Sequence, residues 1–389
     1  MDSKPPSQRQ NTFSLPHLLS NYIDIILGVI LGLGAFSFHQ NGYPYLAVLS
    51  AALAIGALSL TVSEIAEILA ERLEEPYASF VLTFSAVAVE IVLLYMIVLE
   101  STHTPGALET VKGGIISAVI VDMNVLLGLA VFIGGLSYKE QEHNEDTSST
   151  YTTILLVAAS ALLVPSIINY TDSDKNELFH ASVMIAATLM VFYIAIFIFQ
   201  TKTHRHFFKS TAKSRLFRLR KHEGEHDETE IDEHLFDRFN NLGNLLSIFV
   251  LIFIIGVLAE IFAKEGMIVA NELGMSTGLA GLIIAIIAVS PEIMTAIKAA
   301  RDDQIQRVVN IAMGASTVSI MLTVPILMAM AYMNGIYLTL DFNAFQIGAL
   351  ILTIILAWKT TDDGETNYFE GISHLMFFVS YAIIATMYH

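Results

Sequence analysis

Two glutamates lie inside long apolar stretches of this sequence, where a charged side chain is costly. Glu90 lies in LTFSAVAVEIVLL (82–94), and Glu292 lies in IIAVSPEIMTAI (286–297). A carboxylate surrounded by hydrocarbon costs several kcal/mol unless it is protonated, paired or bound to a cation. No lysine or arginine lies at a matching depth in any apolar stretch. We therefore interpret Glu90 and Glu292 as a cation-binding pair and as metal ligands; the alternative is a pair of protonated glutamates that only join helices.

Oxygen atoms from neighbouring residues could complete such a cation site. Pro291 removes a backbone donor, so we expect a helix break that frees carbonyl oxygens near Ile287 and Ala288. Carboxylates combined with carbonyls and hydroxyls, in a chain without cysteine, suit a hard cation such as Ca²⁺ or Na⁺ rather than zinc or copper. The candidate neutral ligands are the side chains of Ser85, Asn124, Ser290, Asn310, Ser316 and Ser319.

Further acids could relay protons or guide cations toward this pair. Asp122 is a third acid in an apolar stretch and is interpreted as a ligand or a proton relay. It lies two positions before Asn124, about 200° around a helix, so the two side chains cannot both point at one site. The i, i+3, i+7 spacing of three glutamates on one helical face predicts a cation or proton vestibule, although the last of them also fits a solvated helix end. These vestibule residues are Glu64, Glu67 and Glu71.

The long hydrophilic interruption at about 200–242 contains a motif that we do not expect to be catalytic. HEGEH (222–226) matches the H-E-x-x-H pattern of zinc proteases. It lies in a charged loop, without the apolar helix face that would hold such a motif. The acidic run that follows could capture or sense cations, but a solvated charge run is the simpler interpretation.

The elements that position the buried acids are predicted to be membrane-spanning helices. Of 389 residues, 54% are hydrophobic and only 15% are charged, a composition that argues against an ordinary soluble enzyme. A helix needs about 20 apolar residues to cross a bilayer. The predicted class is an all-α polytopic membrane protein of about eleven such helices, near 20–38, 45–70, 77–99, 113–136, 151–169, 180–199, 243–263, 276–298, 306–333, 341–358 and 369–388.

The distribution of basic residues predicts the orientation of these helices. With a cytoplasmic N-terminus, all but three of the 20 Lys and Arg residues face the cytoplasm, the exceptions being Lys112, Lys175 and Lys264. The positive-inside rule then favours an external C-terminus and a multi-pass protein of the inner (plasma) membrane. Residues 1–19 lack the pattern of a cleaved signal, so the first helix is expected to be an uncleaved anchor.

The order of the helices indicates an inverted repeat. One leading helix is followed by two blocks of five helices, and the two blocks enter the membrane from opposite sides. SEIAEILAERL (63–73) precedes the helix of Glu90, and GVLAEIFAKEG (256–266) precedes the helix of Glu292. Each acid is then followed by a helix rich in small and polar residues. The expected parts are a tail and first helix (1–44), a first repeat (45–199), a charged cytoplasmic loop (200–242) and a second repeat (243–389).

At these residues the chain resembles the calcium/cation antiporter superfamily, most closely its bacterial calcium/sodium:proton antiporter branch. The resemblance rests on three segments: AEILAERLEEPYASFVLTFSAVAVEIVLL, DMNVLLGLAVFIGGLSYKEQE and AVSPEIMTAIKAARDDQIQRVVNIAMGASTVSIMLTVP. It implies eleven helices in two inverted repeats, cation-binding glutamates at Glu90 and Glu292, and exchange of a cytoplasmic cation for external protons. The expected partners are therefore inorganic cations, protons and the lipid bilayer, with no enzyme activity, no cofactor and no nucleic acid.

One departure from the family pattern bears on the choice of cation. Many calcium/proton exchangers carry glycine and asparagine four and three residues before each acid. This chain has Ala86 and Val87 at one acid and Ala288 and Val289 at the other. Ca²⁺ is the expected cation, with Na⁺ or K⁺ as alternatives. A Na⁺-driven exchanger of the same fold, a cation channel and a membrane sensor are the rival functions.

Overall fold

The protein folds into a bundle of membrane-spanning helices, as the sequence predicts. The structure is a computed structural model that describes residues 22–73, 77–169, 175–204 and 235–387. The N-terminal tail and the HEGEH motif lie outside these ranges. Within the described residues, ten helical stretches are long and apolar enough to cross a membrane, and the 24-residue helix that carries Glu90 completes the eleven.

The leading helix and the first five spans occupy the chain up to residue 203. The fourth span contains a π-helical turn in its middle, between two α-helical segments. The elements are α2 (Ile23–Gln40), α3 (Pro44–Arg72), α4 (Tyr77–Glu100), α5 (Ala107–Val121), the π-turn η1 (Asp122–Leu126), α6 (Leu127–Ser137), β1 (Gln141–Glu142), α7 (Glu145–Asn169), α8 (Lys175–Ile198) and the π-turn η2 (Phe199–Thr203).

The second block again contains five helical spans, which begin at residue 241. Its third span again has a π-turn in its middle, which matches the fourth span of the chain. The elements are the 3₁₀-helix η4 (Leu235–Asp237), α10 (Asn241–Glu272), α11 (Thr277–Arg301), α12 (Ile305–Val318), the π-turn η5 (Ser319–Thr323), α13 (Val324–Met333), α14 (Ala344–Thr361), β2 (Glu365–Thr366) and α15 (Tyr368–Ala385).

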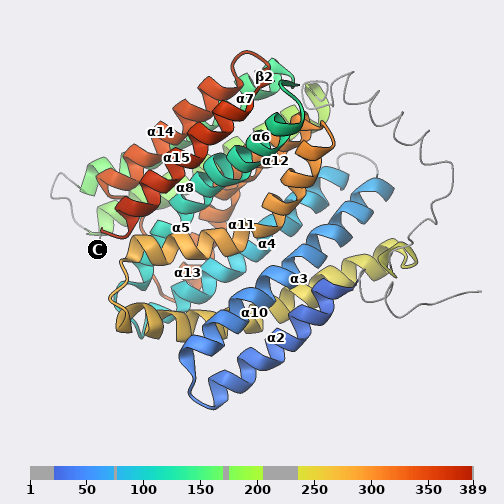
Figure 1. The fold of residues 1–389 in the computed structure, drawn as a ribbon. Helices are drawn as coiled ribbons and strands as arrows, with labels where there is room; N and C mark the ends of the chain where they lie inside the picture. The colour runs from blue at the N-terminus through green and yellow to red at the C-terminus, as the bar shows by residue number, and fades with distance from the viewer. Residues whose placement is uncertain (1–21, 74–76, 170–174, 205–234, 388–389) are drawn as a thin grey trace, which may run out of the picture.

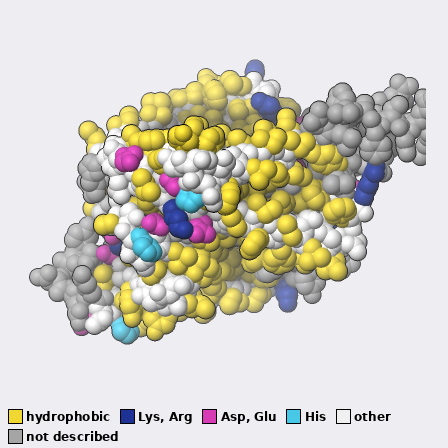
Figure 2. All heavy atoms as spheres, turned by 90° about the horizontal axis from the view of Figure 1, so that it is seen from below, with side chains coloured by type: hydrophobic (Ala, Val, Ile, Leu, Met, Phe, Trp, Pro, Cys, Tyr) yellow, Lys and Arg dark blue, Asp and Glu magenta, His cyan; other side chains and the backbone are white. Residues whose placement is uncertain are grey.

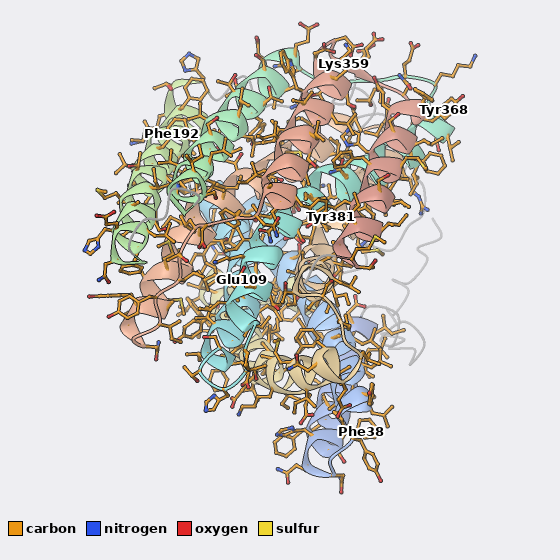
Figure 3. The ribbon with its side chains drawn as sticks, turned by 90° about the vertical axis from the view of Figure 1, so that its left-hand side faces the viewer. Phe38, Glu109, Phe192, Lys359, Tyr368 and Tyr381 are labelled. Atoms are coloured by element: carbon orange, nitrogen blue, oxygen red, sulfur yellow. The ribbon has the colours of Figure 1, made fainter. Side chains whose placement is uncertain are left out.

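The two ends of the bundle carry different connections (Figure 1). We call the end where α3 finishes and α10 begins the loop end. Here Arg72 donates to the carbonyl oxygens of Phe239 and Asp237, at 2.6 and 2.7 Å, and so ties α3 to the start of the second block. The short strands β1 and β2 pair antiparallel at this end. Figure 3 shows Lys359 and Tyr368 at the loop end and Phe38 at the opposite end.

The core of the bundle is the region where the two blocks contact each other. The span of α5, η1 and α6 is the most enclosed, with 83% of its apolar window buried, whereas α2 lies outside with 11%. Helices α5 and α11 cross in direct backbone contact, since a Cβ atom added to Gly281 would lie 2.6 Å from the backbone of Gly113. Small residues at such crossings allow helices to approach closely in a membrane. The crossing holds the helix of Glu292 against the span that contains Asp122.

The outer surface of the bundle is apolar, as a bilayer requires. Exposed large hydrophobic side chains lie along α2, α10 and α15, among them Leu33, Phe253 and Ile383. Figure 2 shows one face of the molecule covered largely by hydrophobic side chains, interrupted by a small group of charged ones. Buried polar residues therefore face the interior of the bundle, where they can line a path for ions.

Candidate cation-binding site

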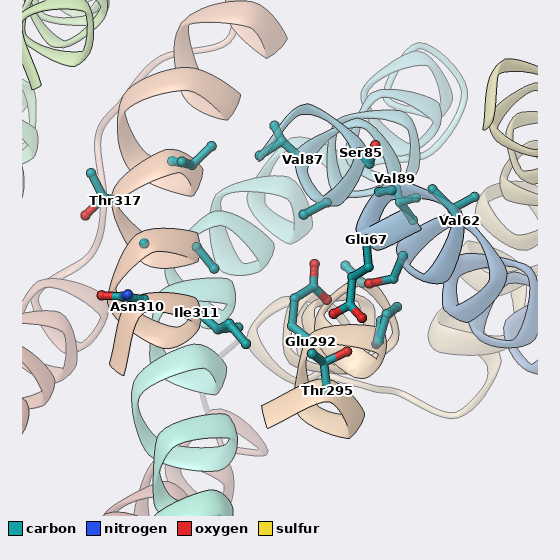
Figure 4. A pocket seen from close by; sticks show the side chains of 18 of the residues that line it. Val62, Glu67, Ser85, Val87, Val89, Glu292, Thr295, Asn310, Ile311 and Thr317 are labelled. Atoms are coloured by element: carbon teal, nitrogen blue, oxygen red, sulfur yellow. The ribbon is translucent and has the colours of Figure 1, made fainter. Parts of the chain in front are cut away.

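A cavity of about 490 Å³ extends into the bundle between the two blocks. It is lined by residues from α3, α4, α7, α8, η2, α11 and α12. The predicted site residues that line it are Glu67, Ser85, Pro291, Glu292 and Asn310. Figure 4 shows the side chains of Glu67 and Glu292 pointing into this space from two different helices. The cavity therefore gives one of the two buried glutamates a path toward the loop end, where Gln200, Thr201 and Arg307 also line it.

Glu90 lies deeper and is held by the π-turn of the second block. Its side chain is 7% exposed. Oε2 accepts hydrogen bonds from Ser319 Oγ at 2.8 Å and from Thr323 Oγ1 at 3.2 Å. The π-turn η5 therefore presents two hydroxyls, four residues apart, to one carboxylate oxygen. The second block therefore holds an acid of the first, because Glu90 belongs to the first block and η5 to the second.

Asp122 begins the matching π-turn η1 and is 1% exposed. Its Oδ2 accepts a hydrogen bond from Ser316 Oγ at 3.1 Å. It lies close enough to both Glu90 and Glu292 for their charges to act on it. Three acids from α4, η1 and α11 thus share one buried region, and their negative charges would repel one another strongly in a low dielectric.

Each of these three acids keeps one buried oxygen without a hydrogen-bond partner among the described residues. The unpaired atoms are Glu90 Oε1, Glu292 Oε2 and Asp122 Oδ1. Buried polar atoms are satisfied in the great majority of cases, so three such oxygens in one region call for a physical account. A proton on the oxygen or a cation beside it would satisfy each of them.

The carboxylates do not form a closed metal cage. Within the described part of the chain, no three carboxylate or imidazole groups converge on a point as metal ligands would.

The predicted helix break at Pro291 is wrong. Helix α11 runs without interruption from Thr277 to Arg301, with Pro291 inside it. The carbonyl of Ile287, which loses its usual backbone donor four residues later, instead accepts a hydrogen bond from Ser290 Oγ at 2.8 Å. Ser290 therefore repairs the helix, and the structure does not direct its hydroxyl to the acids.

Asn124 points away from the three acids, on the other side of its span from Asp122. Its amide nitrogen donates to Thr353 Oγ1 at 2.9 Å and to the Ile120 carbonyl at 3.1 Å. Its amide oxygen lies 3.0 Å from His374 Nδ1, so this ring nitrogen carries the proton. Asn124 is thus engaged in a buried network with α14 and α15, and the structure does not place it at the cavity.

The predicted vestibule is reduced to one of its three glutamates. Glu67 lines the cavity and forms an ion pair with Arg307 of α12. Glu64 and Glu71 do not line it, and Glu71 is exposed near the end of α3. Asn310 lines the cavity one turn beyond Arg307 and accepts from Gln306 Nε2 at 3.2 Å.

Sequence reasoning missed several residues of the site. Thr323 holds Glu90 together with Ser319, and its position four residues after Ser319 could have indicated a shared face. Arg307 was counted only as a basic residue that marks one side of the membrane. Tyr151 and Tyr193 also line the cavity, but tyrosines in apolar stretches carry no signal that separates them from core residues.

Comparison with known proteins identifies the family. The sequence pattern described as "Sodium/calcium exchanger protein" matches residues 43–202 and 243–387, which are most of the chain. The chain belongs to this family. It is therefore a multi-pass membrane transporter and not an enzyme, and the superfamily resemblance seen in the sequence is confirmed.

The relatives of this chain include antiporters that are named for different cations. The chain is 26% identical over 332 residues to the sodium-potassium/proton antiporter ChaA of Escherichia coli, which covers 84% of this chain and 86% of the relative. It is 25% identical over 302 residues to a Ca²⁺/H⁺ antiporter of Synechocystis, which covers 77% and 78%.

Solved structures of exchangers have the same fold. The structure of native YfkE covers 94% of this chain and 99% of its own, with a TM-score of 0.75 and 19% sequence identity. The H⁺/Ca²⁺ exchanger CAX covers 95% and 91%, with a TM-score of 0.68 and 17% identity. The predicted fold of one leading helix and two inverted five-helix repeats is thereby confirmed.

Proposed function

We propose that this protein is a cation/proton antiporter in which Glu90 and Glu292 bind the cation and the proton in turn. The observation that carries the proposal is the set of three unpaired carboxylate oxygens in one buried region, one of whose acids lines the cavity from the loop end. A carboxylate at this depth requires a positive partner, and a cation and a proton are the two partners that transport can supply.

Exchange follows from competition for the same oxygens. When Glu90 and Glu292 are ionised, their charge stabilises a cation between the two inverted repeats. When protons reach them from the other side of the membrane, the cation loses its partners and leaves. The interface between repeats is where secondary transporters place such sites, because rocking of one repeat against the other alternates access to it. Asp122, bonded to Ser316, serves as a third acid that accepts a proton in this cycle.

The transported cation is Ca²⁺, Na⁺ or K⁺. The named relatives transport sodium and potassium in one case and Ca²⁺ in the other. Ala86, Val87 and Ala288 line the cavity with methyl groups, so these positions supply no side-chain oxygen. A divalent ion such as Ca²⁺ requires six to eight oxygen ligands, most of which would have to be backbone carbonyls, hydroxyls and water.

The loop end faces the cytoplasm in this account. Arg72, Lys298, Arg301 and Lys359 all lie in the last turns of helices that finish at this end. The positive-inside rule places such residues in the cytoplasm. The cavity then opens inward, and the N-terminus is cytoplasmic in a plasma-membrane protein.

The test is proton flux in proteoliposomes that hold the purified protein and a pH gradient. Ca²⁺, Na⁺ and K⁺ are added in separate experiments. We expect at least one of them to collapse the gradient through the wild-type protein. A channel would instead pass the cation without any counter-ion gradient. If the folded protein leaves the gradient intact with all three cations, cation/proton exchange is excluded.

A further inference from the structure

A positively charged side chain stands at the mouth of the cavity through which a cation must pass. Arg307 lies in the first turn of α12, in the second repeat, and its guanidinium donates to Glu67 Oε1 of α3, in the first repeat. Both side chains line the same cavity as Glu292. Both are partly exposed, 41% for Arg307 and 36% for Glu67, so water and ions reach them.

The charges that line the cavity are few, so Arg307 has a large share in them. Apart from tyrosines, the described lining residues that ionise are Glu67, Glu292 and Arg307. An arginine stays protonated at all ordinary pH values. Its fixed positive charge offsets the negative charge of Glu67. Arg307 thereby opposes the attraction that Glu67 would exert on cations moving from the loop end toward Glu292.

The geometry points to Arg307 as a selectivity residue, which lowers the preference of the cavity for divalent over monovalent cations. The inference rests on the proposed function, because it concerns the ions that reach Glu292. The electrostatic energy of an ion in a fixed potential is proportional to its charge. The potential from Arg307 thus opposes Ca²⁺ twice as strongly as it opposes Na⁺ or K⁺, whereas Glu67 acts in the opposite direction.

The dependence on ionic charge has a quantitative signature. If removal of the charge increases the affinity for a monovalent ion by some factor, the affinity for a divalent ion should increase by the square of that factor. We expect about 3-fold for K⁺ and about 10-fold for Ca²⁺ at low ionic strength, and less in high salt, which screens exposed charges. A purely structural role for Arg307 would change both affinities by the same factor.

The experiment uses a single reporter cysteine, since the natural chain has none. Thr295 lines the cavity about one turn beyond Glu292 on α11. In Thr295→Cys protein, in detergent, the labelling rate with a neutral thiol reagent is measured against increasing Ca²⁺, Na⁺ or K⁺. The concentration that halves the rate reports binding near Glu292 without any need for transport.

The variants separate the effect of the charge at position 307 from the effect of the shape of its side chain. In the Thr295→Cys background, Arg307→Gln should lower the half-protecting concentration by the two factors given above, and Arg307→Lys, which keeps the charge, should leave both near the parent values. Glu67→Gln should raise them, again with the larger change for Ca²⁺. The ratio of labelling rates with a cationic and an anionic reagent should increase in Arg307→Gln and decrease in Glu67→Gln.

Equal factors for Ca²⁺ and K⁺, or an unchanged reagent ratio in Arg307→Gln, would overturn the role of Arg307. Absence of cation protection in the parent protein would overturn it too, because no cation would then bind where Arg307 acts. Proton flux in proteoliposomes is a separate measurement. Protection with the predicted valence dependence but no flux would reject antiport while leaving the selectivity of the cavity established.

Discussion

Replacement of Glu292 by glutamine should lower cation-driven proton flux at least about 100-fold, because interactions with a buried charged group are worth roughly 3 kcal/mol. Glutamine has nearly the shape of glutamate, but it carries no charge to hold a cation and accepts no proton at ordinary pH. Glu292 is the deep acid that lines the cavity, and its Oε2 has no hydrogen-bond partner among the described residues. The initial rate of gradient collapse in proteoliposomes measures the effect.

The matched control for this substitution is Glu260→Gln. Glu260 is exposed on α10 and pairs with Lys264 one turn away, an ion pair of the kind that contributes about 0–1 kcal/mol. The control changes the charge of the protein by the same amount, and we expect its flux to stay within about 2-fold of wild type, as surface substitutions usually do. Near wild-type flux in Glu292→Gln would show that this acid does not carry the exchange.

Glu90→Gln should also abolish exchange, although Glu90 does not line the cavity. A glutamine at this position can still accept the hydrogen bonds that Ser319 and Thr323 donate. The fold around η5 should therefore persist, and the loss of flux, again at least about 100-fold, would reflect the missing charge and proton. Thermal unfolding in detergent, measured beside the flux, checks that the variant is intact.

Removal of the two hydroxyl donors separates the role of the Glu90 charge from the role of the hydrogen bonds that hold it. In a Ser319→Ala/Thr323→Ala variant, Glu90 keeps its charge but loses both hydrogen bonds to Oε2. Each such bond to a charged group is worth roughly 1.5–3 kcal/mol, so loss of both should weaken cation binding by about 100-fold or more. Exchange should still be measurable at saturating cation, because the charge and the titratable proton of Glu90 remain. If the double variant loses all flux while Glu90→Gln retains it, the hydroxyls and not the glutamate are essential.

The sequence predicted the fold well because the bilayer imposes a simple rule on composition. Each of the eleven apolar stretches corresponds to a helical span, and the leading helix and the two five-helix blocks follow from their number and order. Glu90 and Glu292 stood out because a carboxylate in hydrocarbon has few physical explanations. The same cost of a carboxylate in hydrocarbon also singled out Asp122.

The details of the site were less predictable because they depend on local backbone geometry. The π-turns η1 and η5 have no composition signal, but they decide that Asp122 faces Ser316 and that Ser319 and Thr323 face Glu90. The spacing argument did separate Asp122 from Asn124, but it could not say which of them faces the acids.

Proline gave the clearest error. A missing backbone donor predicts freed carbonyls, but the hydroxyl of Ser290 fills the gap at Ile287, so α11 continues as a regular helix. The ion pair of Glu67 with Arg307 was also out of reach, because the two residues are 240 positions apart in the sequence. Contacts of this kind depend on how the two repeats pack.

The central claim is that one set of carboxylates binds cation and proton in competition. The most direct test is proton release when cation is added to purified protein in weakly buffered detergent solution, followed with a pH-sensitive dye. We predict that the transported cation releases protons from the wild-type protein, and that release is lost in Glu90→Gln and Glu292→Gln. Cation binding without proton release from the wild-type protein would contradict the account. So would proton release from Glu90→Gln and Glu292→Gln that equals the release from wild type.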